Sequence, residues 1–317
     1  MAERVAAAAY TLGWALVRRL PERLGRHAFA GIADAAWRRR TSGVGQLEAN
    51  LERLMAAPVG HDQLRALSRA GMRSYLRYWY EMFRLPALSS AQLHDSVRAV
   101  GVERVEQAVA SGRGVVAALP HMGNWDLAGA WITARGIPLT TVAQRLRPER
   151  LFDRFVAFRS SLGMEVLPLT GAANPFGTLA RRLRSGRLVC LLADRDITES
   201  GVGVTFFGES ARMPGGPALL AQRTGAALLP VSLHYEGRHM VIRVHEEIPV
   251  PAAGDTAAKT RAMTQELAHV FEAEISEHPQ DWHMLQPIFT ADLPGAEPAG
   301  RSTAATSPTS PPPPGQR

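Results

Sequence analysis

A histidine and an aspartate, His121 and Asp126, stand five positions apart directly after an apolar run. Imidazole changes its charge near neutral pH, so a histidine is suited to accept a proton as a general base. A carboxylate on one ring nitrogen would fix the tautomer and leave the other nitrogen free to act. The pair therefore suggests acid–base catalysis, but the same two residues could equally do no more than cap a helix.

The residues around this pair predict a strand, a sharp turn and a helix. Residues 115–119 are all apolar, as expected of a strand that is buried on both faces. Pro120 is expected to end the strand, and Gly123 gives the backbone of the turn its conformational freedom. Asn124 can cap a helix that continues over 125–131. Open α/β sheets bind ligands beyond the carboxyl ends of their strands, so this turn is a suitable place for a catalytic histidine.

Strand-like and helix-like segments alternate over residues 99–292 and predict an α/β fold with a mixed central sheet flanked by helices. Two of the strands, over 227–235 and 239–248, are expected to form a hairpin. Residues 1–98 are expected to be an N-terminal helical region that associates with a membrane. Residues 293–317 are rich in Pro, Ser and Thr, cannot bury a core and are expected to form a disordered tail.

The net charge of +7 favours anionic partners such as nucleic acid, acidic lipid headgroups or phosphorylated substrates. No nucleic-acid-binding motif accompanies this charge, so nucleic acid is not an expected partner. A predicted helix over 62–85 carries arginine at every fourth position from Arg65 to Arg77, with aromatic residues on another side. This pattern fits a helix on an anionic membrane, and it also fits a solvated face above a core-facing stripe. An apolar run over residues 5–17 is too short to span a bilayer.

Searches for other catalytic signatures narrow the chemistry. The chain has no Gly-x-x-x-x-Gly-Lys phosphate loop and no Gly-x-Ser-x-Gly nucleophile elbow. His234, His239 and His245 lack the spacing of a zinc site, so no metal is expected. Residues 201–203 are interpreted as a turn, and residues 206–217 as a shaped loop that leads into a helix.

Several blocks of sequence resemble, in the same order, one family of enzymes. They span about residues 114–290 and include ALPHMGNWDLAGAW, CLLADRD, FFGESARMPGGPALLAQRTGAALLPV and HPQDWHMLQPIF. These blocks are similar to those of the glycerolipid acyltransferase superfamily, which has an H-x4-D motif. Within it they resemble the bacterial lipid A branch and the actinobacterial phosphatidylinositol mannoside acyltransferases. Long blocks in register are more specific than the short motif alone.

The resemblance implies a peripheral enzyme on the cytoplasmic side of the cell membrane. Such an enzyme transfers a fatty acyl chain, palmitoyl-like, from acyl-CoA to a mannose hydroxyl of a phosphatidylinositol mannoside. Acyl-CoA is then a co-substrate, and no cofactor is expected. Two alternatives stay open: an acyltransferase that uses another glycolipid or a lysophospholipid, and a non-catalytic protein that binds lipid or acyl-CoA.

The family pattern also implies roles for individual residues. His121 would be the catalytic base, and Asp126 would be essential or structural. Asp194 stands where the family has a glutamate, and it is expected to orient His121 while Asp126 fixes the turn. Gln144 likewise replaces a family glutamate. The residues expected to bind substrate are Gln144, Arg159, Arg195 and Arg212.

Acyl transfer to an alcohol also needs hydrogen-bond donors for the negative charge that develops on the thioester oxygen. The backbone N–H groups at Gly123 and Asn124, at the start of the predicted helix, are expected to supply them. Direct transfer needs no covalent enzyme intermediate, which agrees with the lack of a nucleophile elbow.

Overall fold

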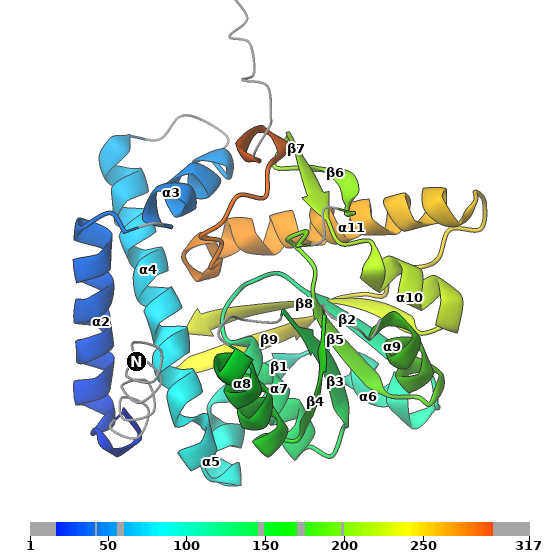
Figure 1. Cartoon of the computed structure of the whole chain (residues 1–317), viewed down its shortest axis with the longest axis horizontal. Helices are drawn as coiled ribbons and strands as arrows, with labels where there is room; N and C mark the ends of the chain where they lie inside the picture. The colour runs from blue at the N-terminus through cyan, green and yellow to red at the C-terminus, as the bar shows by residue number, and fades with distance from the viewer. Residues whose placement is uncertain are drawn as a thin grey trace, which may run out of the picture.

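The computed structural model describes residues 17–293, with gaps at 42, 56–59, 145–148, 170–174 and 198–199. The apolar run over residues 5–17, apart from Val17, and the predicted tail from residue 294 lie outside the described residues. Figure 1 shows a central sheet with helices on both faces and a group of N-terminal helices beside it. This arrangement confirms the predicted α/β fold class, whereas the division into domains stays a prediction.

Seven described strands form the mixed sheet, and each pair of neighbours is parallel except β8 and β9. These two strands form the predicted antiparallel hairpin, although β9 ends at Val244 rather than at residue 248. In spatial order the strands are β1 (Val97–Val100), β9 (His239–Val244), β8 (Ala227–Glu236), β2 (Val115–Leu119), β5 (Leu188–Leu192), β3 (Leu139–Ala143) and β4 (Met164–Pro168).

Strand β2 lies at the centre of the sheet, between β8 and β5. All five of its residues are buried, which explains why its sequence is apolar without alternation. Val116 and Ala118 contribute to the core on one face, and Val115, Ala117 and Leu119 contribute to the core on the other. The strand is therefore fixed on both faces and along both edges, and so is the turn that follows it.

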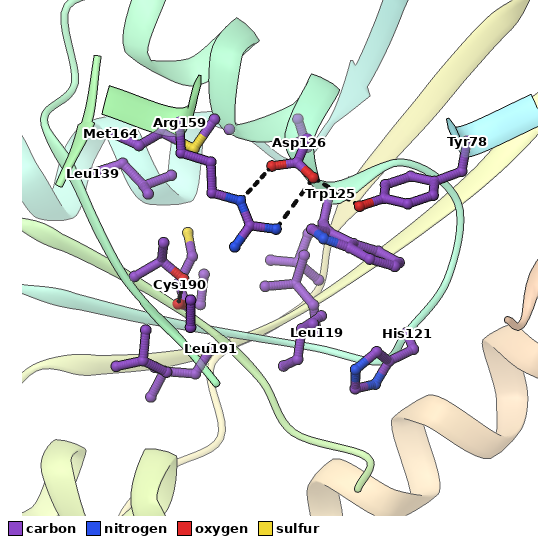
Figure 2. Close-up of a pocket in the computed structure, with 18 of the residues that line it drawn as sticks. Tyr78, Leu119, His121, Trp125, Asp126, Leu139, Arg159, Met164, Cys190 and Leu191 are labelled. Carbon is purple, nitrogen blue, oxygen red and sulfur yellow. Dashed lines mark hydrogen bonds and ion pairs between the residues drawn. The ribbon is translucent and has the colours of Figure 1, made fainter. Parts of the chain in front are cut away.

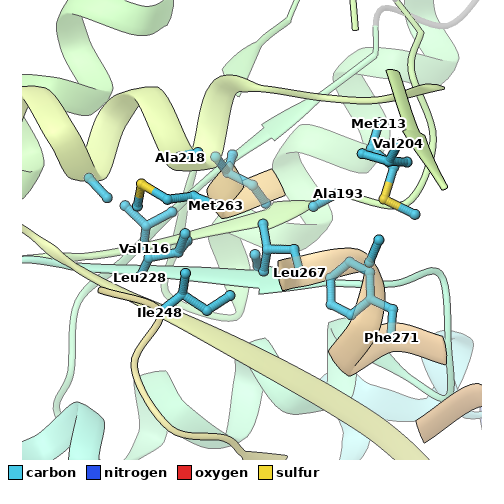
Figure 3. Packing of buried hydrophobic residues seen from close by; sticks show 14 of the residues in the cluster. Val116, Ala193, Val204, Met213, Ala218, Leu228, Ile248, Met263, Leu267 and Phe271 are labelled. Atoms are coloured by element: carbon cyan, nitrogen blue, oxygen red, sulfur yellow. The ribbon is translucent and has the colours of Figure 1, made fainter. Parts of the chain in front are cut away.

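Helices cover both faces of the sheet. On one face, Val116 and Leu228 from the strands pack against Met263, Leu267 and Phe271 of a long helix, as Figure 3 shows. The helices of this face are α9 (Pro175–Arg184), α10 (Gly216–Thr224) and α11 (Thr256–Glu277). Those of the opposite face are α6 (Glu103–Ala110), α7 (Trp125–Ala134) and α8 (Glu149–Ser161).

The N-terminal helices join the α7 side of the sheet through α4, the long helix predicted from its arginines. Arg69 and Arg73 of α4 both form two hydrogen bonds with Asp34 of α2, at 2.6–2.9 Å. These hydrogen bonds hold the pKa of the Asp34 carboxyl well below its usual range. The two arginines therefore join α2 to α4 and are not a free cationic surface. The elements of this region are α2 (Glu22–Arg38), α3 (Val44–Arg53), α4 (His61–Arg84), η1 (Leu85–Ala87) and α5 (Ser90–Asp95).

Residues 201–217 differ from the expected turn and loop. They form a hairpin of β6 (Val202–Phe206) and β7 (Glu209–Met213), which contacts α11. Phe207 and Gly208 have φ angles of 50° and 76°, so they form the tight two-residue turn that antiparallel strands favour. The glycines around this turn made the segment resemble a loop in sequence. The chain then ends its described part with η2 (Pro279–Asp281) and η3 (Thr290–Asp292).

Candidate active site

His121 and Asp194 meet at the carboxyl end of the sheet. Each residue lies two positions after the end of its strand, His121 after β2 and Asp194 after β5, and these two strands are parallel neighbours. The Asp194 carboxylate lies 2.6 Å from His121 Nδ1 through Oδ1, and its Oδ2 accepts a hydrogen bond from the His121 backbone N–H at 2.8 Å. A neutral His121 held in this way carries its proton on Nδ1 and presents a lone pair on Nε2.

The Asp194 side chain is fully buried. Burial alone raises the pKa of this carboxyl, but the charge of His121 and hydrogen bonds from His121 and Trp282 outweigh it, so that the pKa lies below its ordinary value. The Trp282 indole N–H donates to Asp194 Oδ2 at 3.0 Å. The carboxylate therefore stays ionised and stationary beside the imidazole, whose side chain keeps 19% of its surface exposed.

The segment Asp281–His283 runs beside the turn that carries His121. Met122 and Trp282 form an isolated β-bridge. The His283 N–H donates to the His121 carbonyl oxygen at 2.7 Å, and the Gly123 N–H donates to the Asp281 carbonyl oxygen at 2.9 Å. The Gly123 N–H is therefore already bonded within the protein, and the expectation that it stabilises a reaction oxyanion does not hold.

Asp126 turns away from His121 and belongs to a second charged pair. Asn124 caps α7 as predicted, since its side chain accepts from the Leu127 N–H at 2.9 Å. Asp126, in the first turn of this helix, is 1% exposed and binds Arg159 Nε at 2.6 Å and Nη2 at 3.2 Å. The Tyr78 hydroxyl donates to the same carboxylate at 2.8 Å. Figure 2 shows the pair on one side of a cavity and His121 on another.

Burial and charge shift the titration of both partners of Asp126. Burial would lower the pKa of Arg159, but the charge and hydrogen bonds of Asp126 raise it above the ordinary value of an arginine. Burial, followed by the charge of Asp126, raises the pKa of Tyr78 well above 10. Arg159 therefore stays cationic and Tyr78 stays neutral, and the three side chains fasten α7 to α8 and α4.

A deep apolar cavity of about 440 Å³ leads from His121 into the layer between the sheet and the helices. Apart from the polar groups near His121, most of its wall consists of aliphatic and aromatic side chains. They include Ile132, Leu139, Met164, Leu188, Ile242 and Val244. Such a cavity has the size and the apolar lining of a small-molecule site, and it is suited to a hydrocarbon chain.

The substrate-binding candidates fall into two groups. Gln144, Arg159 and Arg195 line the cavity. Arg195 forms no hydrogen bond or ion pair within the described part of the chain, and burial lowers its pKa from the ordinary value against the opposing charge of Asp194. Arg212 is not among the lining residues. It lies on β7, where its Nη2 donates to the Gly201 carbonyl oxygen at 3.0 Å, so the structure does not bring it to this cavity.

Sequence reasoning assigned no role to three residues of the site, Trp125, Trp282 and His283. The block HPQDWHMLQPIF contains two of them and is part of the resemblance, but its spacing gives no sign of contact with His121. His283 lines the cavity, and its buried ring nitrogen Nε2 lies 2.9 Å from Ser74 Oγ. Burial, followed by the charge of His121, lowers its pKa to about 3. A neutral histidine thus stands beside the candidate base.

Comparison of the sequence with known proteins identifies one family that the chain matches over most of its length. The family model for bacterial lipid A biosynthesis acyltransferases matches residues 1–291. A phosphatidylinositol mannoside acyltransferase of Mycolicibacterium smegmatis is 48% identical over 285 residues, which cover 90% of this chain and 91% of the relative. A protein of the same name from Mycobacterium tuberculosis is 47% identical over 290 residues, covering 90% and 89% of the two chains. A lipid A biosynthesis acyltransferase of Haemophilus influenzae is 23% identical over 180 residues, or 56% of each chain.

Proposed function

The chain belongs to the bacterial lipid A biosynthesis acyltransferase family, and on that premise we propose that it transfers a fatty acyl chain from acyl-CoA to a mannose hydroxyl of a phosphatidylinositol mannoside. Membership of the family makes the chain an acyltransferase; the donor and the acceptor are the proposal. The observation that carries it is the His121–Asp194 pair at a deep apolar cavity.

In the proposed reaction, His121 Nε2 removes the proton of the acceptor hydroxyl. The hydroxyl oxygen attacks the thioester carbonyl, a C–O bond forms and the C–S bond breaks. The proton then passes from the imidazolium to the departing sulfur, which leaves as the free thiol of CoA. Asp194 holds the imidazole in the required tautomer and stabilises the imidazolium while it is charged.

The cavity supports a long acyl chain as the transferred group. Burying a hydrocarbon chain is favourable by about 0.8 kcal/mol for each methylene group. His121 lines the same cavity as the aliphatic side chains, so an acyl tail there would leave its thioester near the imidazole. We propose a palmitoyl-like chain as the natural donor group.

Arg195 is the best candidate for binding a phosphate of the substrates. Arg195 lines the cavity and forms no hydrogen bond or ion pair within the described residues. Guanidinium groups match phosphate oxygens in geometry and charge. A phosphate of CoA and the phosphodiester of the acceptor both supply this chemistry.

We propose an anionic membrane surface on the cytoplasmic side as the place of reaction, because the acceptor is a lipid. Within the described residues, no helix combines the length and hydropathy needed to cross a bilayer. The outer face of α2 instead presents Leu24 and Ile32, which are 61% and 53% exposed. Arg23 and Arg38 are exposed on the same helix. Apolar side chains flanked by arginines favour contact with an anionic lipid surface.

The function is tested by incubating the purified protein with palmitoyl-CoA and a panel of acceptors, followed by lipid mass spectrometry. We expect acylation of a phosphatidylinositol mannoside and at least a hundredfold lower turnover for His121→Ala, because the general base is lost. His61→Ala is the matched control, since His61 is an exposed histidine at the start of α4.

Two outcomes would overturn the proposal. If the protein acylates a lysophospholipid but no phosphatidylinositol mannoside, the proposed acceptor is wrong and a lysophospholipid takes its place. Binding of acyl-CoA without turnover on any acceptor, for the wild type as for His121→Ala, would indicate a lipid-binding protein.

A further inference from the structure

Acyl transfer needs a hydrogen-bond donor at the thioester oxygen, and two of the backbone N–H groups beside His121 are already bonded within the protein. The His121 N–H donates to Asp194 Oδ2, and the Gly123 N–H donates to the Asp281 carbonyl oxygen. A catalytic donor must already be in place and must have no partner within the protein before the substrate binds. A side chain of the cavity wall can supply such a donor.

Among the residues that the structure describes, three that line the cavity have a buried side-chain atom without a hydrogen-bond partner. These atoms are Trp125 Nε1, Trp131 Nε1 and His283 Nδ1. A buried polar atom without a partner costs about 1–3 kcal/mol, so a ligand that supplies the partner is favoured. An indole N–H can only donate, and its ligand must therefore be an acceptor such as a carbonyl oxygen.

His283 does not fit the role of donor. The Ser74 hydroxyl donates its proton to Asp281 Oδ1 at 2.5 Å. The 2.9 Å contact between Ser74 Oγ and His283 Nε2 therefore requires the proton of the imidazole on Nε2. His283 Nδ1 is then an acceptor and cannot stabilise an oxyanion.

The two tryptophans differ in their distance from the base. Trp125 is the first residue of α7, and its ring lies edge-on to the His121 ring, with centroids 5.7 Å apart. Trp131 is six residues further along the helix, about 9 Å along its axis. In Figure 2 the Trp125 indole lies between His121 and the Asp126–Arg159 pair, with its nitrogen toward Arg159. Trp125 is thus the indole at the place where a thioester would lie.

The Trp125 ring is also held in position before any substrate binds. It packs against the Tyr78 ring, with centroids 4.3 Å apart, and Tyr78 is hydrogen-bonded to Asp126. Arg159 in turn binds Asp126. A donor fixed in this way needs no reorganisation during the reaction, which is the condition for a large electrostatic contribution.

We propose that the Trp125 Nε1–H group donates a hydrogen bond to the thioester carbonyl oxygen and stabilises the negative charge that this oxygen gains during acyl transfer. The assignment rests on the proposed function. While His121 Nε2 takes the proton of the acceptor hydroxyl, the electron pair of the carbonyl bond moves onto the oxygen that Trp125 faces. It returns when the C–S bond breaks, and the indole keeps its proton throughout.

The test replaces the indole N–H without changing the shape of the ring. Trp125 is exchanged for 3-benzothienylalanine, which carries sulfur in place of N–H, and in a second variant for phenylalanine. We expect kcat to fall about a hundredfold to a thousandfold in both, with the KM for palmitoyl-CoA changed less than threefold. The same sulfur analogue at Trp37, whose N–H donates to Ser68 in the N-terminal helices, is the control. A kcat within threefold of the wild type for the Trp125 analogue would overturn the proposal.

A second measurement reads the hydrogen bond directly and does not need turnover. His121→Gln protein is loaded with palmitoyl-CoA labelled with ¹³C at the carbonyl, and the carbonyl stretch is recorded by infrared spectroscopy. Adding the Trp125 analogue should move the stretch to higher frequency, and an unchanged frequency contradicts the proposal. The rate of thioester hydrolysis in the absence of an acceptor is also compared between the wild type and the Trp125 analogue. If the wild type acylates no glycolipid, the proposed function fails, while the infrared result still decides the role of Trp125.

Discussion

Two histidines of the site are joined by a backbone hydrogen bond and have opposite surroundings. His121 has a buried, ionised carboxylate on Nδ1, which fixes the tautomer of its ring. His283 is buried among aromatic rings and near His121, so its charged form is disfavoured. Environment, and not residue type, thus separates a candidate base from a histidine that stays neutral.

The buried His283 predicts a specific dependence of stability on pH. Its pKa is about 3 in the folded protein and about 6.5 in the unfolded chain, so between these values the unfolded chain binds one more proton. The neutral His283 therefore costs the folded protein no stability above about pH 6.5, and the free energy of unfolding decreases as the pH falls below that value. We expect the free energy of unfolding to drop by about 1 kcal/mol from this residue between pH 6 and pH 5.

Urea denaturation of the wild type and of His283→Gln at both pH values measures this effect. The difference between the two pH values should be smaller in the variant by about the same 1 kcal/mol. Equal differences in the two proteins would mean that the His283 pKa is not lowered on folding.

At the scale of elements, the Asp126–Arg159 pair fastens α7, the helix that follows the turn with His121. Asp126 on α7 is 1% exposed, and Arg159 on α8 is 16% exposed. Removing the arginine leaves a buried carboxylate without its counter-charge, which costs about 3–5 kcal/mol. We therefore expect Arg159→Met to lower the free energy of unfolding by several kcal/mol, measured by urea denaturation.

The matched control for this variant is Arg182→Met. Arg182 pairs with Glu165 at 2.6 Å, but both side chains are about a third exposed, at 34% and 29%. Solvent screens such a pair, and we expect a loss below about 1 kcal/mol. Similar losses of unfolding free energy in the two variants would show that burial does not strengthen the Asp126–Arg159 pair between α7 and α8.

At the scale of the whole molecule, the outer face of α2 is the proposed contact with the membrane. Removing its apolar side chains in Leu24→Gln/Ile32→Gln should weaken binding to anionic vesicles at least tenfold, because each buried leucine or isoleucine contributes about 1.5–3 kcal/mol. Vesicle flotation measures the binding. Val250→Gln is the control, since Val250 is 44% exposed and lies outside the N-terminal helices. If the double variant floats with the vesicles as the wild type does, α2 is not part of the membrane contact.

Much of the local structure followed from the sequence by itself. The apolar run of β2 predicted a strand buried on both faces. Pro120 and Gly123 predicted the turn after it, and Asn124 predicted the cap of α7. Turns and caps could be predicted because they depend on backbone torsions and on neighbours within a few residues. The long arginine-bearing helix was predicted within one residue at either end. The β6–β7 hairpin was missed, since its Phe207-Gly208 turn has the composition of a loop.

Only the tertiary structure decided which groups meet at His121. Asp126 is near in sequence, yet Arg159 and Tyr78, 33 and 48 positions away, turn its carboxylate elsewhere. Asp194 reaches the imidazole because β2 and β5 are adjacent parallel strands. Resemblance suggested that contact, but spacing alone did not, and nothing in the sequence indicated that Trp282 would support it. Spacing along the chain determines turns and caps, whereas strand order determines which distant side chains share a site.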